Sequence, residues 1–156
     1  YDQDFVHRYV EIRDRYEIPP ELLEIEFTES ILVDNTPLLL KTVGELKKAG
    51  FSCSIDDFGK GYSSLSLLKN LPVDVLKIDR LFFVDEDGRE QDLELAHSVI
   101  DLVRKFHIRT VAEGVESEEQ VEQLKEFGCD YVQGYVFYRP MPQEEYEGLL
   151  SHLLLE

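Results

Sequence analysis

The chain has 156 residues, 43% of them hydrophobic and 31% charged, a composition that suits one soluble globular domain. Its formal net charge of −17 argues against binding of polymeric DNA or RNA, because phosphate repulsion would dominate. A small phosphate ligand remains compatible with this charge, provided that cations lie between protein and phosphate. No apolar run approaches the ~20 residues that span a bilayer and no signal peptide is visible. We therefore expect a cytoplasmic domain, whose parent protein could still be membrane-tethered through upstream segments.

The cysteines and histidines give no sign of a zinc site. Cys53 and Cys129 lie in or beside predicted strands without metal-ligand spacing, and the four histidines are scattered. We expect both cysteines to be small buried thiols in a reducing compartment.

The first predicted elements are a helix, a strand and a second helix. Apolar residues at helical spacing (Phe5, Tyr9, Ile12, Tyr16) predict a helix over residues 1–16. Residues 22–28 alternate, with apolar side chains at odd positions and Glu24, Glu26 and Thr28 at even ones, which predicts a strand with two different faces. The next helix is predicted from about Pro37, with Thr36 as N-cap, to Gly50.

Residues 51–80 form the central unit of the prediction. Residues 51–56 alternate as a strand that ends in the adjacent carboxylates Asp56 and Asp57. Gly59 and Gly61 then permit a tight backbone path. The unit closes with a short helix over about residues 65–68, capped by Ser63 or Ser64, and a strand over Val73–Asp79.

The second half continues the alternation of helices and strands. We interpret the acidic segment Asp85–Gly88 as a solvated turn and not a calcium loop, because Arg89 stands where a ligand should be. The remaining elements are a helix over 91–106, a strand over 108–112, a helix with the capping box Ser117/Gln120 that ends at Gly128, a strand over 131–133, and a helix from Met141-Pro142 to Leu155.

This alternation indicates an α/β architecture with parallel strands. Only five strands are visible, whereas a (β/α)₈ barrel takes ~250 residues and seldom fewer than ~200. The alternatives are an open five-stranded sheet and part of a larger barrel. In an open sheet covered on both faces the strands are apolar throughout, but here each strand has one polar face. We therefore favour a TIM-type (β/α) barrel, of which this is the C-terminal five-strand portion.

Polar side chains stand at the C-terminal ends of all five strands. They are Glu26 and Glu29, Asp56 and Asp57, Lys77 and Asp79, Glu113, and Gln133. In a parallel barrel these ends meet at one mouth, where carboxylates held close together cannot all be ionised without compensation. An oxygen-only ligand set favours Mg²⁺ or Mn²⁺, and two such ions can activate a water and stabilise the leaving oxygen of a phosphodiester.

Each feature has a simpler reading when it is taken alone. An Asp-Asp pair after a strand can be a turn and helix cap. Lys77 could be a Schiff-base lysine of a lyase, or the partner of Asp79 in a structural ion pair. We expect Glu24 to lie deep in the lumen and to be structural, bonded to a neighbouring strand.

Taken together, these segments resemble the EAL family of cyclic di-GMP phosphodiesterases. The matching segments are Leu23–Ser30 (LEIEFTES), Ile55–Leu65 (IDDFGKGYSSL), Leu76–Arg80 (LKIDR), Val111–Glu116 (VAEGVE) and Gln133–Tyr135 (QGY). The resemblance implies a Mg²⁺- or Mn²⁺-dependent hydrolase that opens cyclic di-GMP to linear pGpG by two-metal catalysis.

The resemblance also implies a role for each matching residue. The implied metal ligands are Glu26, Asp56, Asp57 and Glu113, with Asp79 beside them. Lys77 would contact the attacking water and act in catalysis with Glu26, Asp56 and Glu113, while Gln133 and Asp57 would contact substrate. Glu29 would brace the loop that contains Gly59 and Gly61, in which Lys60 stands where the family often has threonine.

The family's Glu-Ala-Leu motif and an asparagine ligand lie upstream of the segments matched here. We therefore interpret residues 1–156 as a partial EAL domain that is by itself a poor catalyst. An unpaired barrel edge predicts a homodimer or other self-association. The parent protein is expected to carry GGDEF or sensor domains upstream. The alternative is a catalytically inactive cyclic di-GMP receptor or a protein-interaction module.

Overall fold

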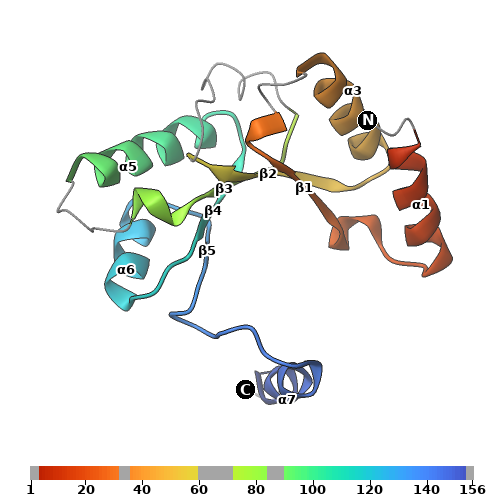
Figure 1. Ribbon diagram of the computed structural model, residues 1–156. Helices are drawn as coiled ribbons and strands as arrows, with labels where there is room; N and C mark the ends of the chain where they lie inside the picture. Colours follow the sequence, from red (N-terminus) through yellow and green to blue (C-terminus); the bar gives the residue numbers. More distant parts are fainter. Residues whose placement is uncertain (1–3, 32–35, 60–71, 84–89, 154–156) are drawn as a thin grey trace.

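A computed structural model describes residues 4–31, 36–59, 72–83 and 90–153 (Figure 1). The helices are α1 (Phe5–Arg15), α3 (Thr36–Lys48), α5 (Glu90–Arg104), α6 (Glu118–Glu126) and α7 (Gln143–Leu153), with short 3₁₀ helices η1 (Pro20–Leu22) and η2 (Arg80–Phe82). The strands are β1 (Glu24–Thr28), β2 (Ser52–Phe58), β3 (Val75–Ile78), β4 (Arg109–Glu113) and β5 (Tyr131–Gln133). The predicted helix at 65–68, Gly61 and the acidic segment at 85–88 lie outside the described residues.

The five strands form one parallel sheet in the order β1-β2-β3-β4-β5. Parallel strands that follow one another in space as in sequence are joined by crossovers of one hand, which places the connecting helices on one side. In Figure 1, α3, α5 and α6 lie around the outside of the sheet, and α7 lies apart from it. This is the arrangement of part of a (β/α) barrel, so the predicted fold class is confirmed.

The two faces of the sheet differ as the alternation predicts. On the helix side, apolar residues of the strands join those of α3 and α5 in one buried cluster that includes Phe27, Ile55, Leu76 and Ile100. On the opposite side, the strand residues are polar or charged towards their C-terminal ends. Burial of apolar area, at about 25 cal/mol per Å², fixes which face turns outward and so fixes where the polar side chains lie.

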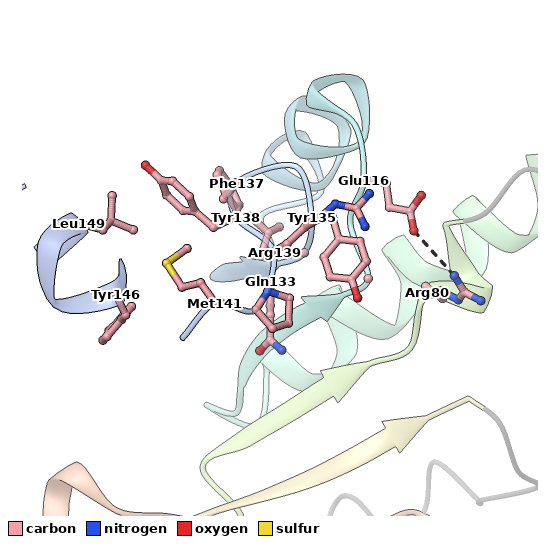
Figure 2. Close-up of a pocket in the computed structure, with 14 residues that line it drawn as sticks. Arg80, Glu116, Gln133, Tyr135, Phe137, Tyr138, Arg139, Met141, Tyr146 and Leu149 are labelled. Carbon is pink, nitrogen blue, oxygen red and sulfur yellow. Dashed lines mark ion pairs between the residues drawn. The ribbon is translucent and has the colours of Figure 1, made fainter. Parts of the chain in front are cut away.

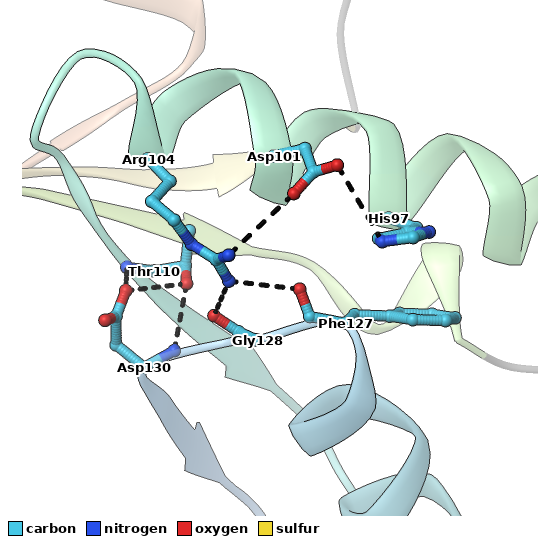
Figure 3. A network of polar contacts seen from close by, with 7 residues as sticks. All are labelled: His97, Asp101, Arg104, Thr110, Phe127, Gly128 and Asp130. Atoms are coloured by element: carbon cyan, nitrogen blue, oxygen red, sulfur yellow. Dashed lines mark hydrogen bonds and ion pairs between the residues drawn. The ribbon is translucent and has the colours of Figure 1, made fainter.

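Two aspartates form hydrogen bonds between neighbouring strands at the N-terminal ends of the strands. Asp74, just before β3, accepts a hydrogen bond from Cys53 N (2.9 Å) and pairs with Lys47. Asp130, just before β5, accepts hydrogen bonds from Thr110 N (2.8 Å) and Thr110 Oγ1 (3.0 Å), as Figure 3 shows. These contacts satisfy backbone donors at the end of the sheet opposite the predicted site.

The helix predicted at the N-terminus forms as α1, and only part of its apolar spacing faces the core. Phe5 packs against the core together with Val6 and Val10, whereas Tyr9, Ile12 and Tyr16 are 40–67% exposed. The three packed residues lie on the part of α1 that turns toward the rest of the chain, where α1 contacts α3.

The two cysteines and Glu24 were also predicted only in part. Cys53 is fully buried, and burial, helped by Asp74, raises the pKa of its thiol to about 11. Cys129 is only half-buried. Glu24 accepts a hydrogen bond from Ser52 Oγ (3.1 Å) on the neighbouring strand, as expected, but it is exposed and not deep in a lumen.

Within the described ranges, none of the helices combines the length and the hydrophobicity that a membrane-spanning helix needs.

Candidate metal centre

An irregularity in β2 brings the two adjacent aspartates to the same side of the sheet. Between the pairs Ile55↔Leu76 and Phe58↔Ile78, β2 advances three residues while β3 advances two, which is a β-bulge. Asp57 takes the extra position with a left-handed backbone (φ 56°), a conformation that aspartate tolerates better than most residues. In a regular strand Asp56 and Asp57 would point to opposite faces. The bulge removes that separation.

Three carboxylates therefore converge at the C-terminal ends of β2 and β4. Asp56, Asp57 and Glu113 each offer one oxygen, and these oxygens all lie within 4.8 Å of one another. All three residues are half-buried. Such a spacing fits ligands of a shared divalent cation better than separate surface acids.

The Lys77 ammonium lies among these carboxylates and also reaches β1. Its Nζ is 2.8 Å from Glu26 Oε1, 2.9 Å from Glu113 Oε1 and 3.3 Å from Asp56 Oδ1. The Lys77 side chain is only 10% exposed, whereas Glu26 is 46% exposed at the rim. The Lys77 ammonium thus links residues of β1, β2 and β4. Glu26, Asp56 and Glu113 lie close together around it, as the sequence predicted.

The charges of this cluster shift two pKa values. Burial alone would lower the pKa of Lys77, but hydrogen bonds to Glu26 and Glu113, with the charges of Glu113 and Asp56, outweigh it and raise the pKa above its usual value. The raised pKa favours the charged form of Lys77, whereas Schiff-base chemistry needs a neutral amine. Burial raises the pKa of Glu113, opposed by Lys77 and reinforced by Asp56.

The donor set fits a hard divalent cation. Asp56 Oδ1 is buried and, within the described part of the chain, has no hydrogen-bond donor, although Lys77 Nζ lies 3.3 Å away. A buried carboxylate oxygen without a hydrogen bond is costly, and a metal ion satisfies it. Burial, the main cause of the raised pKa of Glu113, makes its charged form costly, and a bound cation would favour that charged form. Oxygen ligands without sulfur or imidazole suit Mg²⁺, Mn²⁺ or Ca²⁺.

Glu29 and Gly59 support the bulge from behind. Glu29 is 4% exposed, and its Oε2 accepts a hydrogen bond from Gly59 N (3.0 Å), while Glu29 N donates to Asp56 O (3.0 Å). The carboxylate of Glu29 is thus turned toward the backbone that follows the aspartates. This contact agrees with a bracing role for Glu29, and that role stays a prediction.

Asp79 directly follows β3, and Gln133 ends β5, the two strands that flank β4. Asp79 is buried and accepts a hydrogen bond from Leu81 N (3.0 Å), which caps η2, so its predicted part in metal binding rests on resemblance alone. Gln133 pairs in register with Glu113 and lines a separate cavity of about 770 Å³, which α7 also helps to line. Figure 2 shows this cavity among aromatic residues and Arg139, whose guanidinium lies 4.6 Å from the Tyr135 ring. The three carboxylates are not part of its lining.

Sequence reasoning missed how the site is assembled. The pattern of residues 51–57 gave no sign of the bulge, because a period of two assigns alternate faces to every residue. The sequence also suggested Asp79 as a possible ion-pair partner of Lys77. In the structure, Lys77 forms ion pairs with Glu26, Asp56 and Glu113. The signal that was available is Gly59, since a glycine soon after a strand often marks a bulge or a close backbone approach.

A family model places the chain in a known class of proteins. The EAL domain model matches residues 1–140, and the chain therefore belongs to the EAL domain family. Among curated relatives, cyclic di-GMP phosphodiesterase NbdA of Pseudomonas aeruginosa is 44% identical over 128 residues, which cover 82% of this chain and 16% of that protein. The chain thus spans less than a fifth of that relative's length.

Two solved structures are similar to this chain and carry ligands. PaMucR phosphodiesterase in complex with cyclic di-GMP matches with a TM-score of 0.86 and 38% identity, covering 92% of this chain and 64% of that one. BlrP1 of Klebsiella pneumoniae, in a complex with manganese and cyclic di-GMP, matches with a TM-score of 0.82 and 31% identity, covering 90% of this chain and 36% of that one. Proteins that are similar to this chain in structure have thus been solved with cyclic di-GMP, one of them also with manganese.

Proposed function

We propose that this chain is part of a phosphodiesterase that hydrolyses cyclic di-GMP to linear pGpG with two Mg²⁺ or Mn²⁺ ions. The observation that carries the proposal is the convergence of Asp56, Asp57 and Glu113 to within 4.8 Å of one another. Relatives of this chain that are named for this activity, or were solved with cyclic di-GMP, support the choice of substrate.

The residues that would hold the ions are Asp56, Asp57 and Glu113, with Glu26 at the rim. Asp79 is added only because the family resemblance implies it. When bound, such ions activate a water and neutralise charge that develops on the phosphodiester. Lys77 adds a fixed positive charge whose N–H groups can donate to the water or to a phosphoryl oxygen. Because its pKa is raised, Lys77 keeps this charge throughout the neutral range.

The other side chains position the substrate and the ligands. Gln133, with an amide nitrogen and oxygen at the end of β5, is suited to hydrogen bonding with a nucleotide. Glu29 accepts the Gly59 N–H and so helps to fix the backbone directly after the aspartates. We further propose self-association of the chain and GGDEF or sensor domains elsewhere in the protein.

The test is turnover of cyclic di-GMP by the full-length protein that carries this chain, followed by chromatography of pGpG in Mn²⁺ or Mg²⁺. We expect Asp56→Asn to lower turnover by at least about a hundredfold, since a metal centre supplies several kcal/mol of transition-state stabilisation. Cyclic di-GMP binding, measured by calorimetry, should persist. Asp101→Asn, which changes an exposed acid on α5, is the matched control and should leave turnover unchanged.

The competing function is a receptor that binds cyclic di-GMP without cleaving it. Retention of Glu26, Asp56, Asp57, Lys77 and Glu113 argues for the enzyme, because binding alone needs fewer of them. Tight binding with no pGpG formed by the unmodified protein, in either metal, would favour the receptor and end the proposal of an enzyme.

A further inference from the structure

We propose that Phe82 is a positioning residue for the metal-binding carboxylates. Its ring holds Gly59 in place and so holds the bulge that turns Asp56 and Asp57 toward Glu113. This inference rests on the proposed function, since it concerns the same metal centre. It assigns a role to an apolar residue that lies on a different element and touches no metal.

The contact between Phe82 and Gly59 leaves no space for a side chain. Phe82 lies on η2 and is 9% exposed. A Cβ atom added to Gly59 would lie 1.8 Å from Phe82 Cε2 and 2.6 Å from Cζ, so the ring packs directly against the glycine backbone. Gly59 also has φ +108°, a conformation that other residues rarely adopt. The backbone at this point is therefore fixed by packing and by conformation together.

Gly59 is held from a second side by Glu29, whose carboxylate accepts the Gly59 N–H at 3.0 Å. Two residues earlier, Asp57 has the left-handed backbone that creates the bulge. Without the ring of Phe82, the segment after Asp57 would lose its packing partner on one side. The bulge could then relax toward regular alternation, which points Asp56 and Asp57 to opposite faces.

The residue next to Phe82 in the chain, Phe83, is hydrogen-bonded to the segment that follows Glu113. Gln120 Nε2 donates to Phe83 O (3.2 Å), while Gln120 Oε1 accepts from Glu116 N (2.9 Å) at the start of α6. Asp79 caps η2 through Leu81 N. The segments after β2, β3 and β4, each of which follows a residue of the metal centre, are thus joined through η2. Phe82 is the residue of η2 that packs against Gly59, two residues after the bulge at Asp57.

The experiment measures Mn²⁺ affinity of this chain directly, by the electron paramagnetic resonance signal of free Mn²⁺, at temperatures well below thermal unfolding. We expect Phe82→Ala to weaken Mn²⁺ binding by about tenfold or more, the cost typical of residues that orient metal ligands. The matched control is Phe51→Ala, which removes a fully buried ring at the other end of β2. It should lower the melting temperature without changing Mn²⁺ affinity in the folded protein.

Gly59→Ala tests the same contact from the other side and should weaken Mn²⁺ binding by a similar factor. Because both changes act on one contact, the double variant Gly59→Ala/Phe82→Ala should be little weaker than either single variant. If Phe82→Ala does not fold, Phe82→Leu replaces it. That variant keeps an apolar side chain but not the flat ring, and a measurable loss of affinity is expected.

Folded Phe82 variants that bind Mn²⁺ as tightly as the wild type would overturn this inference and leave the proposed function intact. Equal losses of Mn²⁺ affinity in Phe82→Ala and Phe51→Ala would also overturn it, because they would indicate general loosening. Absence of Mn²⁺ binding by the wild-type chain would instead count against the metal centre itself.

Discussion

Lys77 is the residue on which the electrostatics of the metal centre depend. It is buried, and its Nζ contacts carboxylates from three different strands. A buried cation is tolerated only where it is well paired, and the pairing here is reciprocal, because the carboxylates also need it. A divalent cation would share this task. We therefore expect Lys77 to stabilise the fold without metal, in addition to the catalytic role proposed for it.

We expect Lys77→Met to destabilise the chain in chelator by about 3 kcal/mol, because it leaves Asp56 and Glu113 close together without a compensating charge. Added Mn²⁺ should restore more stability to this variant than to the wild type, since the ion supplies the missing positive charge. Urea unfolding with chelator or with Mn²⁺ measures both effects.

Lys47→Met is the control for that prediction, because Lys47 pairs with Asp74 at the opposite ends of the strands. It should lose stability that Mn²⁺ does not restore beyond the wild-type gain. A Lys77→Met variant that is as stable as the wild type in chelator would show that the carboxylates do not depend on this ammonium.

At the scale of elements, the sequence predicted where helices and strands occur because their signals are local. The capping box of Ser117 and Gln120 forms as predicted, and the helices before Gly50 and Gly128 end at glycines with positive φ. The alternation of apolar and polar side chains in residues 23–28 and 51–56 predicted which face of the sheet is polar. The bulge and the outer face of α1 were not predictable in this way, because packing between distant segments determines them.

The N-terminal ends of the strands carry stabilising contacts, and the C-terminal ends carry the candidate metal centre. This difference leads to a prediction about Asp130. Its carboxylate accepts hydrogen bonds from the backbone and side chain of Thr110, which is 1% exposed (Figure 3). We expect Asp130→Ala to destabilise the chain by about 1–3 kcal/mol, because it leaves a buried N–H without an acceptor. Mn²⁺ affinity should not change, since residues at this end of barrel strands contribute to stability and not to the active site.

Asp101→Ala serves as the comparison for Asp130→Ala. Asp101 is an acid in the same region, but it is 52% exposed and pairs loosely with Arg104 (3.9 Å). Its removal should change the free energy of unfolding by less than about 0.5 kcal/mol. Equal stability of the two variants would show that the contact to Thr110 contributes little.

At the scale of the molecule, the sheet has two outer strands with different edges. The edge of β1 carries Glu24 and Glu26, and charges on an edge strand discourage pairing with another chain. The edge of β5 carries no charge, and its Tyr131 is 54% exposed. Exposed aromatic residues continue beyond it at Tyr135 and Phe137. If the chain self-associates, β5 is therefore the edge where contact should occur.

The negative net charge of the chain opposes self-association. Self-association should therefore depend on the salt concentration. With a formal charge of −17, two copies repel each other, and salt screens the repulsion, with a Debye length of about 10 Å at 0.1 M and about 3 Å at 1 M. We expect the mean mass in sedimentation equilibrium to rise with the sodium chloride concentration.

Tyr131→Lys, which places a charge on the β5 edge, should suppress this rise in mean mass. Leu95→Lys makes the same charge change at a 49% exposed position on α5 and should not. A monomer at every salt concentration would contradict self-association, and equal suppression by both variants would place the contact away from β5.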